Sequence, residues 1–384
     1  MSAQMLHSIA DAGQCTLHLN YHGAFLDTVV IGAGLSGLTA AATLRGAGAD
    51  VSVVEADAHI GGRIRSLRDI AGEHAVGDLG PTWVWPKYQP VAARWLERLG
   101  MATFEQFSEG DAVITGYGPT PLRQPVLSQD GMVRIQGGPS ALIETLANQI
   151  GGSCLRTSAR AVSVLQDGHK SVAINLSSGE VITAQRVIIS IPLRVAATTL
   201  LLPWAPPALK DAMLGMPTWM STHAKAVVLY ERPFWRDAGL SGRIASRVGP
   251  LIEAHDHSGV DGSPAALFGF VGWSPEQRRN DPEGLRTAIL NQLAECFGPH
   301  AANPLELAVQ DWATNPNIVT ASDLTHPAAH PDIGPSILRA SHLNGRVRFA
   351  VSEASELSPG LIEGALAIGE TAALKCLSET HLRD

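Results

Sequence analysis

Charged and aromatic residues are both scarce in this 384-residue chain, at 17% and 5% of its positions, whereas hydrophobic residues make up 45%. This balance excludes an intrinsically disordered chain, and together with the lack of a repeat it excludes collagen and coiled coil. Positive charge is scarce too: 28 Lys and Arg face 36 Asp and Glu, a net charge of −8 without a basic run. We therefore expect no nucleic-acid partner and no membrane partner, and favour a small molecule.

Cysteines and long apolar runs are also few. The cysteines lie far apart without CxxC or Cys/His ligand spacing, which indicates reduced thiols and a cytoplasmic protein. The longest largely apolar stretch, residues 29–44, contains three glycines. It is shorter than the roughly 18 to 20 residues of a membrane span, so no such span is expected. The four cysteines are Cys15, Cys154, Cys296 and Cys376.

The first 27 residues show no charged segment followed by an apolar one, so they do not have the pattern of a secretory signal. Residues 16–21 alternate as a strand does. Two interpretations stay open for residues 1–27: a loosely held leader, or a segment that includes a strand.

Thirty-eight glycines and 24 prolines predict many turns, and the length fits two domains. After residue 27, a β-branched run at 29–31 meets Gly32 and continues as a helical pattern to Gly46, and a strand follows at 51–55. This β-turn-α-β unit predicts a parallel sheet. Other expected elements are helices at 140–150 and 361–377, a hairpin at 162–181, and strands at 186–191, 224–230, 265–271 and 346–351.

The turn after the first strand has the spacing G-x-G-x-x-G. Gly32 permits the tight turn, Gly34 lets backbone amides approach a pyrophosphate, and Gly37 allows close packing of helix on strand. Ser36 lies inside the motif, and Glu55 follows 18 residues after Gly37, where its carboxylate can accept from ribose hydroxyls. The pattern predicts a dinucleotide site; the alternative is a glycine-rich turn and a solvated glutamate.

A second glycine turn follows the second strand. Gly62 and Arg63 there suit a cofactor whose pyrophosphate is approached from two sides, by backbone and by a guanidinium. An ordinary turn would explain these residues as well.

Six segments along the chain occur in the order that is typical of one protein family: residues 29–65, 77–84, 218–225, 233–235, 345–354 and 360–365. Through these segments the chain resembles the flavin-containing monoamine oxidase family. The resemblance implies a fold of α/β class, with a doubly wound (Rossmann-type) FAD-binding domain and a second, mixed α+β substrate domain. It assigns residues 28–81, 132–193 and 326–384 to the FAD-binding domain, residues 82–131 and 194–325 to the substrate domain, and leaves residues 1–27 as a leader.

The resemblance also implies site residues. Ser352 and Glu353 would meet the ribityl and phosphate region, the backbone of Val162 would meet the adenine, and Leu361 would begin a helix aimed at the flavin pyrimidine. For Val162 an ordinary strand valine is the alternative, and for the helix an ordinary amphipathic helix is. The segment Gly80-Pro81-Thr82 would pass beside the cofactor, and Pro81 stands where the family prefers glycine.

Lys225 is the predicted catalytic residue. It interrupts the run 224–230, which is apolar on both faces, and a lysine so placed is rarely left without a partner. The resemblance implies that Lys225 holds a water against flavin N5 and assists reoxidation. The alternative is a lysine that extends to a sheet edge.

Three departures from the family bear on the substrate pocket and on how the flavin is attached. Leu361 stands where one ring of an aromatic cage is expected, and no aromatic residue lies between Trp312 and Phe349 to supply the other. No cysteine lies in that span either, which predicts non-covalent FAD. The segment between Trp83 and Met132 is short for the family, which predicts a more open pocket. Four tryptophans are candidates to line the pocket or to pack in the core: Trp83, Trp85, Trp219 and Trp273.

The resulting hypothesis is an FAD-dependent oxidoreductase that converts an amine to an imine, which hydrolyses to an aldehyde or ketone, while molecular oxygen becomes hydrogen peroxide. One alternative is a dehydrogenase or desaturase of a bulkier or non-primary-amine substrate. Another is a flavin-binding protein without turnover. No metal site is expected, because the two histidines of His255-Asp256-His257 have no third ligand in register.

Overall fold

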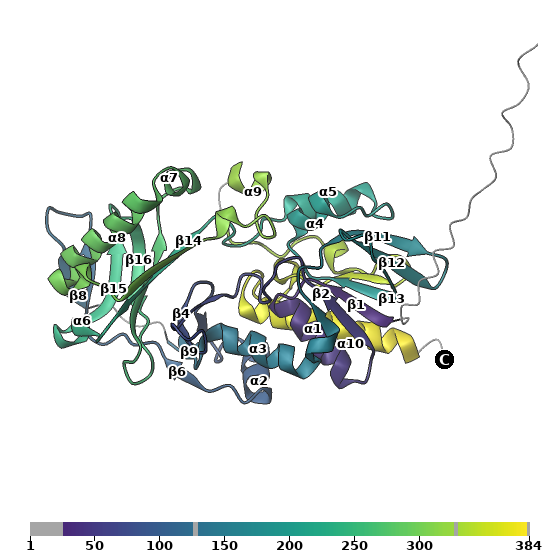
Figure 1. Cartoon of the computed structure of the whole chain (residues 1–384), viewed down its shortest axis with the longest axis horizontal. Helices are drawn as coiled ribbons and strands as arrows, with labels where there is room; N and C mark the ends of the chain where they lie inside the picture. Colours follow the sequence, from purple (N-terminus) through teal and green to yellow (C-terminus); the bar gives the residue numbers. More distant parts are fainter. Residues whose placement is uncertain (1–25, 126–129, 326–328, 382–384) are drawn as a thin grey trace, which may run out of the picture.

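The structure is a computed structural model that describes residues 26–125, 130–325 and 329–381. Two large β-sheets lie toward opposite ends of the molecule, each with helices packed on it (Figure 1). The strand-like pattern at 16–21 falls outside the described residues. Within the described ranges, every helix is too short or too polar to cross a bilayer.

The first sheet has seven strands in the order β10-β2-β1-β13-β12-β11, with β19 also paired to β13. Strands β10, β2, β1, β13 and β19 are parallel, whereas β11 and β12 form an antiparallel extension. This confirms the predicted parallel sheet and the α/β class. The strand bounds are β1 Leu26–Ile31, β2 Val51–Val54, β10 Leu155–Arg156, β11 Ala161–Asp167, β12 Ser171–Leu176, β13 Val181–Ile189 and β19 Val347–Phe349.

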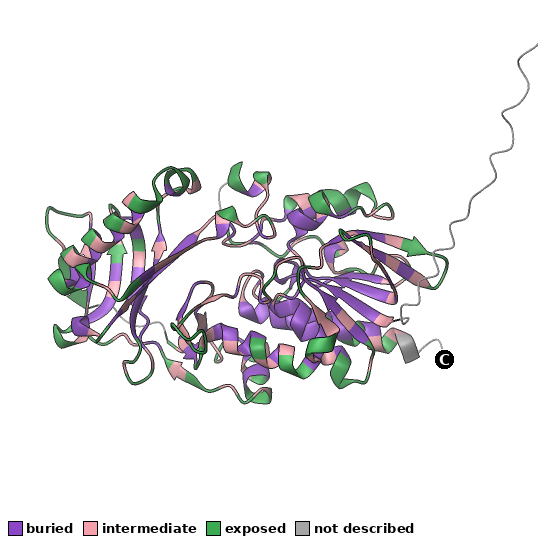
Figure 2. Ribbon diagram, in the orientation of Figure 1, coloured by how far each residue is buried: buried purple, intermediate pink, exposed green. Residues whose placement is uncertain are grey.

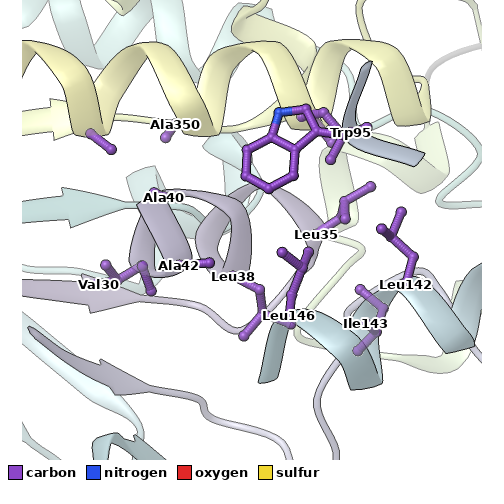
Figure 3. Close-up of a cluster of buried hydrophobic side chains, with 14 of the residues drawn as sticks. Val30, Leu35, Leu38, Ala40, Ala42, Trp95, Leu142, Ile143, Leu146 and Ala350 are labelled. Carbon is purple, nitrogen blue, oxygen red and sulfur yellow. The ribbon is translucent and has the colours of Figure 1, made fainter. Parts of the chain in front are cut away.

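Both faces of this sheet are covered, which explains why β1 reads as a continuous apolar run. Val30 packs with the helices α1, α3 and α10, whereas Val29 and Ile31 point to the opposite core, because successive strand residues alternate between faces. Figure 3 shows side chains of α1 and α3 and the ring of Trp95 meeting in the hydrophobic core that also contains Val30. The helix bounds are α1 Leu35–Gly46, α3 Gly138–Ile150 and α10 Ile362–His381.

The second sheet also has seven strands, in the order β18-β14-β17-β16-β15-β7-β8. Helix α8 covers one face through Leu285, Ile289 and Leu293, and the central strands β14 and β17 are buried for most of their length, whereas β8 at the edge is exposed (Figure 2). The predicted strands at 224–230 and 265–271 are confirmed. The bounds are β7 Asp111–Thr115, β8 Leu122–Pro125, β14 Ala224–Tyr230, β15 Leu240–Ser246, β16 Leu251–Asp256, β17 Ala265–Val271, β18 Glu306–Asp311, α6 Phe234–Asp237, α7 Pro275–Asn280, α8 Pro282–Phe297 and α9 Ala321–Thr325.

Three further helices and two small sheets connect these layers. Helices α4 and α5 pack into the core of the first sheet, and the backbone amides of Val91 and Ala92 at the start of α2 donate to Glu363 of α10. We therefore propose that the first unit includes α2 and extends to about residue 216, beyond the expected divisions at 82 and 194. The bounds are β3 Ser66–Arg68, β4 Ala75–Asp78, β5 Trp83–Val84, β6 Thr103–Glu105, β9 Val133–Ile135, α2 Pro90–Arg98, α4 Leu193–Thr199 and α5 Pro207–Gly215.

Candidate functional site

A cavity of about 520 Å³ extends from the carboxyl ends of β1, β2 and β13 to the second sheet. This position is where doubly wound sheets bind their ligands, and the volume lies within the range of small-molecule and cofactor pockets. Eleven of the predicted site residues line it. They are Gly32, Gly34, Ser36, Glu55, Gly62, Arg63, Gly80, Pro81, Thr82, Ser352 and Leu361.

Four predicted residues do not line the cavity. Lys225 and Glu353 lie directly behind it, in contact with lining residues. Gly37 packs against the turn of Gly32. Val162 is replaced at the cavity by its neighbour Ala161, while the carbonyl of Val162 accepts from the amide of Leu201.

Helix α1 points its amino end at the cavity. Its N-cap is Gly34, no side chain caps the first amides, and the first turn contains no acidic residue. A Cβ placed on Gly34 would meet no protein atom within 4 Å, so the backbone is open to a ligand there. Uncapped amides and the helix dipole together favour a phosphate group.

Gly37 and Gly34 give opposite predictions for a substitution by alanine. A Cβ on Gly37 would lie 2.0 Å from the carbonyl oxygen of Gly32, so Gly37→Ala should lower the free energy of unfolding of the cofactor-free protein by about 1 to 3 kcal/mol. Gly34→Ala should keep that stability and lose retention of the cofactor. Denaturant unfolding and gel filtration with added FAD measure the two effects; a fully stable Gly37→Ala protein would contradict the close contact.

Glu55 is buried at the end of β2 and is held by two backbone amides. Its Oε2 accepts from Ala33 at 2.7 Å, and its Oε1 accepts from Asp57 at 2.8 Å. Burial raises the pKa of Glu55, against the effect of these hydrogen bonds. Glu55 lines the cavity, and each of its carboxylate oxygens can accept a further hydrogen bond, which suits acceptance from ligand hydroxyls.

Arg63 forms an ion pair with Glu353 that joins distant segments. Its two terminal nitrogens donate to both carboxylate oxygens of Glu353, at 2.5 and 3.0 Å, and to the Ser352 hydroxyl and the Trp219 carbonyl. Burial raises the pKa of Glu353, but Arg63 and its other donors bring that pKa below its ordinary value. The Arg63 charge is therefore already balanced by Glu353, and this residue holds two segments of the cavity wall together.

Lys225 lies on β14, between β17 and β18, and its side chain is buried. Its ammonium donates to the carbonyl of Gly80 at 2.8 Å and to the hydroxyl of Thr82, and it lies 4.0 Å from the ring centroid of Phe268. The alternative of a lysine extending to a sheet edge is therefore wrong. Burial lowers the pKa of Lys225 to about 7, with Asp78 opposing and Arg134 adding to this decrease.

The end of the cavity near Lys225 is aromatic. Three of the four candidate tryptophans line it, whereas Trp273 does not. Phe270 was missed by sequence reasoning, because only the strand register, in which it pairs with Lys225, brings it to the cavity. Trp312 lines the cavity as well, and Leu361 closes the side where the family carries a ring. The aromatic wall is formed by Trp83, Trp85, Trp219, Phe270 and Trp312.

Residues 255–257 serve as hydrogen-bonding groups. His255 pairs with Glu253 at 2.7 Å, and His257 Nε2 accepts from the amide of Asp78 at 2.8 Å. Across the described ranges, no group of three His, Cys, Asp or Glu side chains is arranged to hold a metal ion.

Models of two known protein families together match most of the chain. The sequence model described as "Flavin containing amine oxidoreductase" matches residues 120–377, and the one described as "NAD(P)-binding Rossmann-like domain" matches residues 30–99. A probable flavin-containing monoamine oxidase A of Dictyostelium discoideum is 28% identical over 62% of this chain and 51% of its own length. The chain therefore spans about half the length of such curated relatives.

Two further similarities cover more of the chain. A putrescine oxidase of Kocuria rosea is 23% identical over 93% of this chain and 96% of its own length. The solved structure of putrescine oxidase bound to putrescine has a TM-score of 0.77 and 20% identity, and covers 92% of this chain and 99% of its own. This structural similarity confirms the fold, with a doubly wound domain and a second sheet domain.

Proposed function

Because the chain belongs to the family of flavin-containing amine oxidoreductases, we propose that its cavity binds FAD non-covalently and that the protein oxidises an amine. The observation that carries the proposal is the continuity of the cavity: the uncapped end of α1 and Glu55 lie at one end, and an aromatic wall beside Lys225 lies at the other. Relatives named as amine oxidases support the reaction class.

The residues present fit FAD. The amides at the start of α1, with Gly34 open to a ligand, would hold a pyrophosphate, and Glu55 would accept from ribose hydroxyls. Ser352 would donate to the ribityl and phosphate region, and Ala161 with the backbone of Val162 would lie beside the adenine. The start of α10, directly after Leu361, would place partial positive charge near the flavin ring.

When bound, FAD would supply the redox chemistry: loss of two electrons and two protons converts the amine to an imine, water hydrolyses the imine to an aldehyde or ketone and ammonia or an amine, and oxygen receives the two electrons and two protons to give hydrogen peroxide. The protein positions the reactants. Trp219 and Phe270 would hold the apolar part of a neutral amine and exclude water, and the Lys225 ammonium would hold a water at the cavity wall.

We expect anaerobic mixing with primary amines to bleach the visible flavin absorbance, and admission of oxygen to restore it. A panel of primary, secondary and cyclic amines with matched alcohols tests this by stopped-flow spectroscopy. Bleaching only by bulky or non-amine compounds would favour the dehydrogenase alternative, for which the aliphatic Leu361 in the cavity wall is the relevant feature. An absence of bleaching by every compound would favour a flavin-binding protein without turnover.

A further inference from the structure

A group of buried titratable side chains lies behind the cavity wall, around Lys225. Strand β4 contributes Asp78, β9 contributes Arg134, and the end of β16 leads to His257. All four side chains are buried, with exposed fractions of 3% for Asp78, 3% for Lys225, 8% for Arg134 and 1% for His257. Buried charges require partners, so the pairing within this group decides the state of Lys225.

Strand β4 fixes Asp78 beside β14. A Cβ on Gly77 would lie 2.5 Å from Val227, which shares a face of β14 with Lys225, so the two strands are in close contact. Two residues after Asp78, the carbonyl of Gly80 accepts from the Lys225 ammonium. In the chain, Asp78 therefore lies between Gly77, which contacts β14, and Gly80, which binds the Lys225 ammonium.

His257 is held neutral in this arrangement. Its Nε2 accepts a hydrogen bond from the backbone amide of Asp78, so its proton must be on Nδ1. Burial lowers the pKa of His257 well below its ordinary value, and the nearby Arg134 and Lys225 charges add to the decrease. His257 Nε2 also lies 3.4 Å from Oδ2 of Asp78, so His257 contacts both the backbone and the carboxylate of Asp78 and contributes no charge near neutral pH.

The other charged groups near Lys225 are committed elsewhere. The guanidinium of Arg134 donates to the carbonyls of Ser258 and His257. The carboxylate of Asp256 is bound by Arg236, at 2.7 and 2.9 Å. The neighbouring strands place Phe270 and Gln310 in register with Lys225, and these add no charge. Among the described residues, Asp78 is the carboxylate whose charge favours the Lys225 ammonium.

We propose that Asp78 is a positioning residue for Lys225: its buried carboxylate favours the ammonium form of the lysine, which donates to Gly80 and Thr82 at the cavity wall. The proposal rests on the proposed function in one respect, that FAD occupies the cavity next to this lysine. Nothing in the family resemblance assigns a role to Asp78, which acts through Lys225 without lining the cavity itself.

For both Asp78 and Lys225, burial disfavours the charged form, and the charge of the other residue favours it. Burial lowers the pKa of Lys225 to about 7, and it raises the pKa of Asp78 to about 6, while each charge opposes the shift of the other. Removal of the carboxylate leaves Lys225 with burial and the positive charge of Arg134 alone, both of which lower its pKa. The lysine is then neutral at physiological pH and loses its charge and one of its three donor protons.

The test is a pH titration of the visible absorbance of bound FAD, which responds to charge next to the flavin and requires no turnover. Wild type should show two transitions, one near pH 6 and one near pH 7, which belong to the pair. The near-isosteric Asp78→Asn variant should show a single transition, that of Lys225. Its midpoint should lie at least about one pH unit below the wild-type transition near pH 7, which corresponds to a tenfold weaker proton affinity of the lysine. The double variant Asp78→Asn with Lys225→Met should show none.

Controls separate the possible failures. Asp69→Asn, in the exposed loop that follows β3, should leave both transitions in place. An Asp78→Asn protein that keeps the transition near pH 7 would overturn the role of Asp78 and leave the proposed function intact. A single transition in wild type would overturn the pairing even where Asp78→Asn does not fold. Protein that binds no FAD would overturn the proposed function and this inference with it.

Discussion

Replacing Arg63 by alanine is expected to lower the free energy of unfolding by about 3 to 5 kcal/mol and to abolish retention of FAD. Glu353 is 2% exposed, and Arg63 is its ion-pair partner, so the substitution leaves a buried carboxylate without a counter-charge. The same guanidinium also binds Ser352 and the carbonyl of Trp219, so the cavity wall loses three connections at once. Urea unfolding at neutral pH measures the loss.

The matched control is the double variant Arg63→Ala with Glu353→Gln. Because it removes both charges, it should recover much of the lost stability without restoring FAD retention. Equal stability of wild type and Arg63→Ala would contradict the ion pair.

The same pair predicts a dependence on pH. The pKa of Glu353 is below its ordinary value of 4.5 in the folded protein, so the stability it contributes is present above pH 4.5 and is lost as the pH falls through the folded value. In Arg63→Ala the carboxylate is buried alone, and its pKa is raised instead. The difference in stability between wild type and Arg63→Ala should therefore narrow as the pH falls from neutral toward 4.5. A constant difference would show that charge is not the cause.

The second large effect is expected at Lys225. Lys225→Met keeps the length and apolar stem of the side chain but removes the ammonium that faces Gly80 and Thr82. We expect the rate of flavin reoxidation by oxygen to fall on the order of 10²-fold, because a donor and a charge are lost where negative charge develops. Reduction of the flavin by an amine should change much less, since hydride transfer does not pass through this side chain.

Stopped-flow spectroscopy separates these half-reactions. The control is Lys210→Met on the exposed surface of α5, which should leave both rates at the wild-type level. Unchanged reoxidation in Lys225→Met would contradict the role of the lysine, and an equal fall in both half-reactions would indicate a general disturbance of the cavity.

The first β-turn-α-β unit could be predicted from sequence because its determinants are local. The glycine spacing, the β-branched strand and the helical pattern ending at Gly46 all lie within residues 29–55, and the structure has β1, α1 and β2 there. Both faces of the sheet are covered, so the apolar pattern and the tertiary environment agree.

The expected adenine contact at the backbone of Val162 stays a prediction. The resemblance suggested that residue, and the structure has its neighbour Ala161 at the cavity. The pairing of β11 with β12 has an irregularity between Ala161 and Ser163, which interrupts the regular alternation of side chains between the two faces. A strand pattern read from one sequence does not locate such a bulge.

Long-range pairs were also beyond sequence reasoning. Arg63 and Glu353 are 290 residues apart in the chain, and Asp78 and Lys225 come from strands of different sheets. The apolar residues around Lys225 in its strand indicate that the lysine is buried. The residues that contact Lys225 follow only from the packing of β4 against β14. The aromatic wall could not be predicted either, because Phe270 reaches the cavity only through the register of β17 with β14.

The most direct test of the account is the cofactor content of the purified protein. We predict a yellow protein that releases intact FAD on acid precipitation, in a ratio near one per chain, with no flavin left on the precipitate. A colourless protein that takes up no added FAD would contradict the central claim that this cavity binds FAD.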